Sequence, residues 1–266
     1  MPTLPSGSPE PHQHRQIAES FGADAERYDR ARPRYPAALL DRLVAGRDRP
    51  AVLDVGCGTG IVARQLRDRH CAVLGVEVDP RMAELARQTG VDVEVSSIED
   101  WDPRGRVFDV VVAGQAWHWV DPVAGAAKAR AVLPPGGRFA AFWNYGQPPA
   151  DLGAAFAAVY ERLLPDLPFD LGKLPAGSPY AAMCATAAAG LRTAGGFGAA
   201  QEWHFTWEHT YTRADWLDVL PTQGAFTRLP AARLAEVLAG IGAAIDAAGG
   251  SFPMSYETVT VTSAAE

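Results

Sequence analysis

Two hydrophobic patterns alternate along the first 144 residues of the chain. Short apolar runs of four to seven residues are typical of strands buried in a sheet, and stretches with apolar residues at helical spacing lie between them. The alternation predicts a parallel, doubly wound α/β sheet. The strands are expected at 52–55, 72–77, 91–95, 107–113 and 138–143, and the helices at 37–45, 61–69, from 79 onward and at 122–133.

Beyond Asn144 this alternation stops. Residues 201–211 alternate with period two and 255–262 are rich in β-branched residues, so both stretches predict strands, which we expect to pair antiparallel. The predicted fold is therefore a Rossmann-like, mostly parallel sheet of seven strands with an antiparallel edge hairpin. Helices are expected at 151–164, 181–194, 215–220 and 230–248, and cap insertions over the ligand edge near 145–200 and 212–252.

The chain before the first strand divides into a tail and a lid. Residues 1–13 are rich in Pro, Ser, Gly and His, which predicts a disordered tail. We expect the domain to occupy 14–266, and its segment 14–46 to form a lid of two helices separated by the proline-containing sequence RARPRYP at 30–36. Ordinary packing of Tyr28, Arg32 and Tyr35 is the alternative interpretation.

Composition narrows the class of protein. With 266 residues, 48% of them hydrophobic, the chain can form one large domain. A net charge of −7 argues against broad binding to nucleic acid, which depends on phosphate neutralisation. The three widely spaced cysteines predict neither disulfides nor a metal site. We expect a cytoplasmic protein without a leader peptide, membrane span or metal, and both a monomer and a homodimer remain open.

The sequence VLDVGCGTG at 52–60 carries the strongest functional signal. An apolar strand leads into glycines at every second position, and a helix follows, which is the arrangement of a nucleotide-binding corner. Glu77 ends the next strand, where a carboxylate can accept hydrogen bonds from two ribose hydroxyls. The spacing is GxGxG, whereas a dinucleotide site has GxGxxG, and the lysine of a phosphate loop is missing.

The corner resembles the signature of class I S-adenosylmethionine-dependent methyltransferases, small-molecule branch. The similarity extends to the lid sequence, to Ser97 where the family often has Asp, to the 114–119 loop and to LPPGG at 133–137. The resemblance implies S-adenosyl-L-methionine as the cofactor. It also implies cofactor contacts from Tyr28, Arg32, Asp54, Gly56, Cys57, Gly58, Glu77, Val78, Met82, Ser97, Ile98 and Gln115.

The acceptor side is predicted from aromatic residues and one histidine. His118 is the candidate general base, because it lies in the loop after the fourth strand; a structural histidine is the alternative. Aromatic walls favour a flat or apolar acceptor, although the row on 203–211 is also typical of core under a cap. The predicted acceptor-binding residues are Tyr35, Trp119, Trp143, Tyr145, Trp207 and Tyr211.

The predicted function is methyl transfer to an O, N or C atom of a small aromatic or heterocyclic metabolite, in secondary metabolism. Two alternatives stay open. One is an NAD(P)-dependent oxidoreductase on a similar sheet, and the other is a protein that keeps the cofactor site without catalysis. Binding of S-adenosylhomocysteine, and failure of NAD to bind, would separate the first alternative from our prediction.

Overall fold

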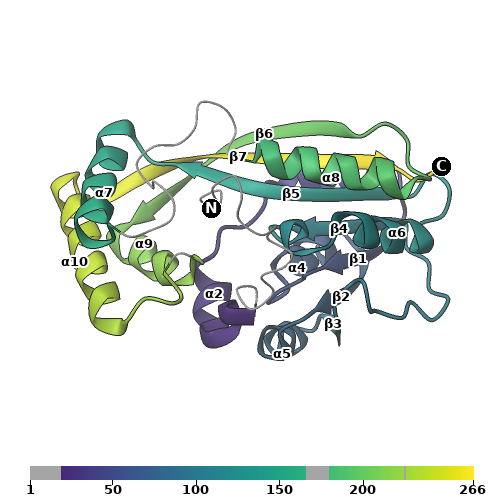
Figure 1. The fold of residues 1–266 in the computed structure, drawn as a ribbon, viewed down its shortest axis with the longest axis horizontal. Coiled ribbons are helices and arrows are strands. Elements are labelled where there is room, and N and C mark those ends of the chain that lie inside the picture. Colours follow the sequence, from purple (N-terminus) through teal and green to yellow (C-terminus); the bar gives the residue numbers. More distant parts are fainter. Residues whose placement is uncertain (1–18, 166–179, 225) are drawn as a thin grey trace.

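A computed structural model describes residues 19–165, 180–224 and 226–266 (Figure 1). Its central feature is a seven-stranded sheet with the strand order β3-β2-β1-β4-β5-β7-β6. The predicted tail at 1–13 lies outside the described residues. The strands are β1 (Ala51–Val55), β2 (Ala72–Glu77), β3 (Asp92–Val95), β4 (Val110–Gly114), β5 (Arg138–Gln147), β6 (Gln201–Thr212) and β7 (Ser251–Ala264).

Helices cover both faces of the sheet and one end of it (Figure 1). The described 3-10 turns are η2 (Glu19–Asp24), η3 (Trp117–Trp119) and η4 (Leu220–Thr222). The α-helices are α2 (Ala25–Ala31), α3 (Ala37–Val44), α4 (Ile61–Arg67), α5 (Pro80–Gln88), α6 (Pro122–Val132), α7 (Ala150–Leu163), α8 (Ala181–Ala194), α9 (Arg213–Val219) and α10 (Ala231–Ala247).

The pairing of the strands confirms the predicted topology. β1 pairs in parallel with β2 and with β4, and β4 pairs in parallel with β5. β7 lies antiparallel between β5 and β6. The strand order reverses between β1 and β4, so the glycine turn after β1 opens at the point where ligands bind in sheets of this type.

The predicted bounds of two parallel strands are wrong. β4 begins at Val110 rather than at 107, because the Asp109 carboxylate accepts a hydrogen bond from the Ala51 amide and anchors the chain before the ladder starts. Val107 is 59% exposed as a result. β5 continues to Gln147 instead of ending at 143, because β7 pairs with it along its whole length.

The long strands β5, β6 and β7 extend past the parallel part of the sheet to a cap of α7, α9 and α10 (Figure 1). A separate apolar core, which includes Phe156, Trp216, Ile241 and Phe252, joins these helices to the strand ends. The predicted cap at 145–200 included α8, and this is wrong. α8 packs beside α6 on the sheet, where Gly190 lies so close to the carbonyl of Pro122 that a side chain would clash.

Within the predicted lid segment, the 3-10 turn η2 leads into α2, and α3 follows the proline-containing sequence at 30–36. η2 packs on α5, and a Cβ on Gly22 would lie 2.0 Å from an Asp79 carboxylate oxygen. α2 packs on α9, where Arg27 and Arg30 both pair with Asp218. The lid therefore bridges the glycine corner and the cap.

Candidate active site

The glycine turn folds tightly because its residues adopt backbone angles that favour glycine. Gly56, Gly58 and Gly60 have φ values of +64°, +56° and +84°. A Cβ on Gly56 would lie 2.5 Å from the Cβ of Ala116. The amides of Gly56 and Cys57 donate to the carbonyl of Val76, which fixes the turn to β2. The backbone of the turn can therefore approach a ligand closely.

A pocket lies against this turn. Its empty volume is about 490 Å³, open solvent at its mouth included. The lid, the glycine turn and the ends of β4 and β5 all contribute to its wall. The lining residues are Tyr28, Arg32, Pro33, Tyr35, Asp54, Gly56, Cys57, Gly58, Thr59, Ile61, Val62, Gly114, Gln115 and Asn144. Eight of the predicted site residues are among them.

Asp54 is a buried acid in this wall. It is 1% exposed, and among the described residues its carboxylate has no ion-pair partner and no hydrogen bond of good geometry; only the backbone amide of Ala63 lies close enough to oppose the rise of its pKa. Burial, followed by the nearby charge of Glu77, raises the pKa of Asp54 to about 8. A buried carboxylate without a partner is costly unless a cation joins it. The site therefore suits a ligand with a positive group, such as an ammonium.

Glu77 lies beside the turn rather than in the pocket lining. Its Oε2 accepts a hydrogen bond from the Gly58 amide at 2.8 Å, and its Oε1 accepts one from the Asp79 amide at 2.9 Å. Each oxygen retains a second lone pair, so both can still accept ribose hydroxyls. Met82 is buried against Gly58, and Val78 is half-buried between Glu77 and Asp79.

The loop after β3 carries the predicted adenine contacts. The Ser97 hydroxyl donates to the Asp100 carboxylate and accepts from the Asp100 amide, so it caps its own turn. Ile98 is 2% exposed and packs in the core. The Ser97 hydroxyl is therefore engaged locally, and backbone groups are the free contacts that this loop offers an adenine.

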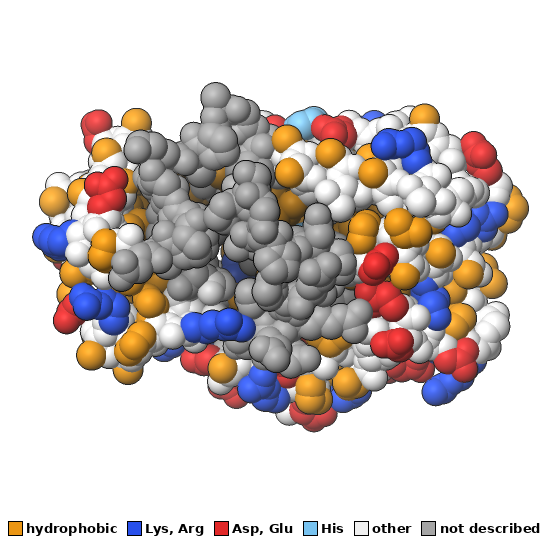
Figure 2. Space-filling view, in the orientation of Figure 1, with side chains coloured by type: hydrophobic (Ala, Val, Ile, Leu, Met, Phe, Trp, Pro, Cys, Tyr) orange, Lys and Arg blue, Asp and Glu red, His pale blue; other side chains and the backbone are white. Residues whose placement is uncertain are grey.

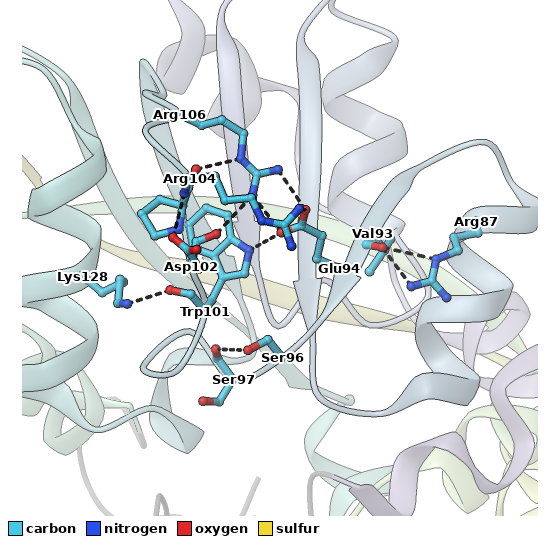
Figure 3. A network of polar contacts seen from close by, with 11 residues as sticks. Arg87, Val93, Glu94, Ser96, Ser97, Trp101, Asp102, Arg104, Arg106 and Lys128 are labelled. Carbon is cyan, nitrogen blue, oxygen red and sulfur yellow. Dashed lines mark hydrogen bonds and ion pairs between the residues drawn. The ribbon is translucent and has the colours of Figure 1, made fainter.

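A polar network holds this loop in place (Figure 3). The guanidinium of Arg106 donates two hydrogen bonds to Glu94, of 3.0 and 2.8 Å, and the Trp101 indole donates a third. These hydrogen bonds lower the pKa of Glu94 to about 2. Lys128 of α6 donates to the carbonyl of Trp101 at 2.6 Å. The network ties both ends of the loop to β3 and α6.

The lid contributes aromatic and charged groups to the pocket. The Arg32 guanidinium lies 4.8 Å from the centre of the Tyr28 ring. Tyr35 packs edge-on against Phe142, with ring centres 4.9 Å apart. Asp29, which the sequence did not single out, accepts a hydrogen bond from Thr59 of the glycine turn at 2.7 Å. The shared pocket lining places Tyr28, Arg32 and Tyr35 beside the glycine turn.

Asn144 is a pocket residue that the sequence interpretation missed. Its backbone carbonyl accepts hydrogen bonds from the Gln115 amide group and the Tyr180 hydroxyl, and its side chain donates to the carbonyl of Arg34. Gln115, a predicted cofactor residue, has a φ of +56°, which aims it toward Asn144. The signal available in the sequence was a lone polar residue at the end of an apolar strand.

His118 lies outside the described pocket lining. Its Nδ1 accepts a hydrogen bond from the Trp143 indole at 3.2 Å, so the neutral ring carries its proton on Nε2. Burial lowers the pKa of His118 to about 3. The Nε2–H of this buried ring has no acceptor among the described residues, and the lowered pKa keeps the ring neutral at neutral pH. The geometry favours the structural alternative over a general base.

The predicted acceptor-binding aromatics fall on different faces. Along β5, alternate side chains point to opposite sides. Trp143 and Tyr145 therefore pack toward α8 with Tyr180, on the face opposite Asn144, and neither is among the residues that line the pocket at the glycine turn. Trp119 lies beside His118, with ring centres 4.6 Å apart.

Trp207 and Tyr211 project from the same face of the sheet as Asn144. The Trp207 indole donates to Thr258, and the Thr258 hydroxyl donates to the Asn144 side chain. The Tyr211 hydroxyl lies 2.8 Å from that of Tyr256. Tyr211 and Tyr256 belong to the apolar core of the cap, against which Trp207 and Ala31 of the lid pack.

Surface charge, possible metal ligands and helix hydrophobicity do not point to a second site in the described part of the chain. Acidic and basic side chains are interspersed over the face shown in Figure 2. Within the described part of the chain, no group of His, Cys, Asp or Glu side chains could hold a metal ion. No helix among those same residues is both long and apolar enough to cross a membrane.

Comparisons with known proteins match the chain to methyltransferases. Residues 53–141 match a family described as "Methyltransferase domain". An uncharacterized methyltransferase of Mycobacterium bovis is 35% identical over 132 residues, which cover 49% of this chain and 54% of that protein. The malonyl-[acyl-carrier protein] O-methyltransferase of Enterobacter lignolyticus is 32% identical, over 57% of this chain and 62% of that protein.

A solved structure matches more of the fold. It is described as "a Putative Type II Methyltransferase" from Anaeromyxobacter dehalogenans and is 26% identical, with a TM-score of 0.63 over 88% of this chain and 97% of that one. The chain itself spans little more than half the length of the mycobacterial relative. Fold, motif and matches agree in their resemblance to class I S-adenosylmethionine-dependent methyltransferases.

Proposed function

We propose that the protein binds S-adenosyl-L-methionine in the pocket below the glycine turn and transfers its methyl group to a small-molecule acceptor. The observation that carries this proposal is the unpaired, buried carboxylate of Asp54 in the pocket wall. A cofactor with an ammonium group and no phosphate suits that carboxyl, because it can form an ion pair with the ionised group, whereas the pyrophosphate of NAD would gain no ion pair from it.

The residues present fit this cofactor. Asp54 would pair with its ammonium, Glu77 would accept its ribose hydroxyls, and the loop at Ser97 and Ile98 would cover its adenine. Tyr28 and the glycine turn close the pocket from either side. When bound, the cofactor supplies a methyl group already activated on a sulfonium. The protein then acts by orienting the acceptor and excluding water, which can be worth about 7 kcal/mol or more.

The acceptor is proposed to be small, because the lid and cap cover the ligand edge of the sheet. The relatives leave this open, since the names of two describe action on malonyl-[acyl-carrier protein] and on trans-aconitate. An aromatic or heterocyclic ring remains favoured by Trp207 and the tyrosines of the cap. The cytoplasmic setting and the lack of a nucleic-acid partner also remain proposals.

Thermal denaturation tests the proposal. S-adenosylhomocysteine should raise the melting temperature of the wild type, and NAD should leave it unchanged. A rise with NAD alone would favour the oxidoreductase alternative. Transfer of labelled methyl groups to a panel of small acceptors would then separate an enzyme from a protein that only binds the cofactor.

A further inference from the structure

The lid helix α2 is attached to the molecule without burying a side chain. None of its seven residues is buried. The helix lies between α9 of the cap and α5 beside the glycine turn, and η2, which precedes it, also packs on α5 (Figure 1). A segment that buries little apolar surface moves at a lower free-energy cost than one anchored in a core. α2 can therefore move while the sheet stays intact.

On one side, polar contacts join α2 to the cap. Arg27 and Arg30 both donate to the carboxylate of Asp218 in α9, at 3.1 and 2.8 Å. Directly after the helix, Arg32 donates to the carbonyl of Thr222 at 2.7 Å. Two guanidinium groups that share one carboxylate form a network, and networks hold better than an isolated surface ion pair. α2 and the cap therefore form one unit.

On the other side, Asp29 joins α2 to the glycine turn. Its Oδ1 accepts a hydrogen bond from the Thr59 hydroxyl at 2.7 Å and another from the Arg64 guanidinium. Arg64 also donates to the carbonyl of Thr59 at 2.7 Å. Thr59 is 1% exposed and lines the pocket, and the side chains of Asp29 and Arg64 are each 22% exposed. We call these three residues the latch, because they hold the lid to the pocket wall.

The chain after α2 is fixed to the sheet and not to the cap. The Gln65 side chain of α4 accepts a hydrogen bond from the Tyr35 amide at 3.0 Å and donates one to the Tyr35 carbonyl at 2.9 Å. α3 then packs into the core through Leu39, Leu40 and Leu43. Residues 32–36, which are neither helix nor strand, connect these two differently anchored helices. The chain can therefore bend between Arg32 and Tyr35.

We propose that α2 is a gate for the cofactor, and that the latch of Asp29, Thr59 and Arg64 sets how often this gate opens. The inference rests on the proposed function, because it takes the pocket as the cofactor's. Opening breaks the latch and separates η2 from α5, while α2 stays with the cap. Tyr28 of α2 lines the pocket, so this movement uncovers the ligand.

Such a latch controls the rates of exchange and leaves the affinity unchanged. Its three residues bond to one another and use no group of the ligand, so the latch opposes entry and release alike. Breaking it raises the open population by the same factor with and without ligand. The rate constants kon and koff then rise together, and their ratio stays the same. A residue that contacts the ligand or shapes the pocket would instead change koff and the affinity together.

Exchange of S-adenosylhomocysteine by the full-length protein tests the gate. Stopped-flow tryptophan fluorescence measures kon, a chase of tritiated ligand with unlabelled ligand measures koff, and calorimetry measures Kd. Asp29→Ala should raise kon and koff by about tenfold each, the effect of losing a hydrogen bond to a charged group. Its Kd should change by less than about twofold. Glu26→Ala removes an equal charge from an exposed position on the same helix and should leave both rates unchanged.

A second variant breaks the latch from its other side. Arg64→Gln should also raise both rates, and the double variant should be within about twofold of Asp29→Ala, because each single change breaks the same contact. If Asp29→Ala does not fold, Asp29→Asn, which keeps the size of the side chain and removes its charge, takes its place. Both kon and koff should then still exceed those of the wild type.

Each contrary result has a distinct meaning. Unchanged rates in a folded Asp29 variant would refute the gate. A rise in koff with a matching loss of affinity would assign Asp29 to the bound ligand or the shape of its pocket, and would also refute it. Multiplied effects in the double variant would show that Asp29 and Arg64 act separately, which contradicts a shared latch. Failure of the wild type to bind S-adenosylhomocysteine would instead refute the proposed function.

Discussion

Replacing Asp54 by Asn removes the buried charge beneath the glycine turn and keeps the shape of the side chain. Because burial and Glu77 raise the pKa of Asp54 to about 8, the free protein at pH 7 holds this carboxyl about 90% protonated. Pairing with an ammonium requires the ionised form. Binding of S-adenosylhomocysteine to the wild type should therefore release about 0.9 proton at pH 7.

The sign of the pH dependence follows. Below about pH 8, ionising the carboxyl costs about 1.4 kcal/mol more for each unit by which the pH drops. The affinity for S-adenosylhomocysteine should therefore fall about tenfold per pH unit. In the unliganded protein the folded pKa is raised above the usual value near 4. The stability that the protonated carboxyl of Asp54 contributes to the folded protein is therefore fully present below about pH 4 and is lost as the pH rises toward about 8.

Calorimetric titration in buffers of different ionisation enthalpy measures both quantities. Asp54→Asn should release no proton, and its affinity should be weaker at pH 8 by about 1.5–3 kcal/mol, the scale of a hydrogen bond to a charged group. Asp68→Asn, exposed just after α4, is the matched control and should behave as the wild type. Equal affinity of wild type and Asp54→Asn, with no proton released by either, would refute this reasoning.

Three further predictions concern neighbouring groups. Glu77→Ala should weaken S-adenosylhomocysteine binding by about 1.5–3 kcal/mol in calorimetry, whereas the exposed Glu84→Ala should not; equal affinity would remove Glu77 from the site. The His118 ring should stay neutral from pH 5 to 8 in a proton NMR titration, because its pKa is about 3. A titration midpoint near 6.5 would make His118 a candidate general base again. Glu94→Gln should lower the melting temperature at pH 7. The difference in melting temperature between wild type and variant should shrink as the pH falls from about 4.5 toward 2, because only the ionised form of Glu94, favoured by its lowered pKa, stabilises the fold. A difference independent of pH would assign it to packing.

The parallel sheet and the glycine corner could be predicted because their signals are local. A buried parallel strand is apolar throughout, and GxGxG marks a turn whose backbone angles side chains disfavour. Asp54 and Glu77 follow from their places at the ends of two such strands. Their burial and the two amide hydrogen bonds of Glu77 do not, since those depend on the packing of β2 against the turn.

The residues of the acceptor side were harder to predict from the sequence, because their positions depend on strand length and on contacts between distant parts of the chain. With β5 expected to end at 143, Trp143 could be assigned to a pocket; its continuation to Gln147 puts Trp143 on one face and Asn144 on the other. Arg32 donates a hydrogen bond to the carbonyl of Thr222, 190 residues later in the chain, and hydrophobic periodicity does not predict a contact over such a separation. Tyr256 lies beside Gly146 of β5 only because of the antiparallel register between β5 and β7.

A crystal structure with S-adenosylhomocysteine bound tests the central claim most directly. The account predicts the ammonium of that ligand within hydrogen-bond distance of the Asp54 carboxylate, and its ribose hydroxyls on Glu77. The sulfur should face the side of the pocket on which Asn144 lies. A ligand bound elsewhere, or bound in this pocket with its ammonium away from Asp54, would contradict the account.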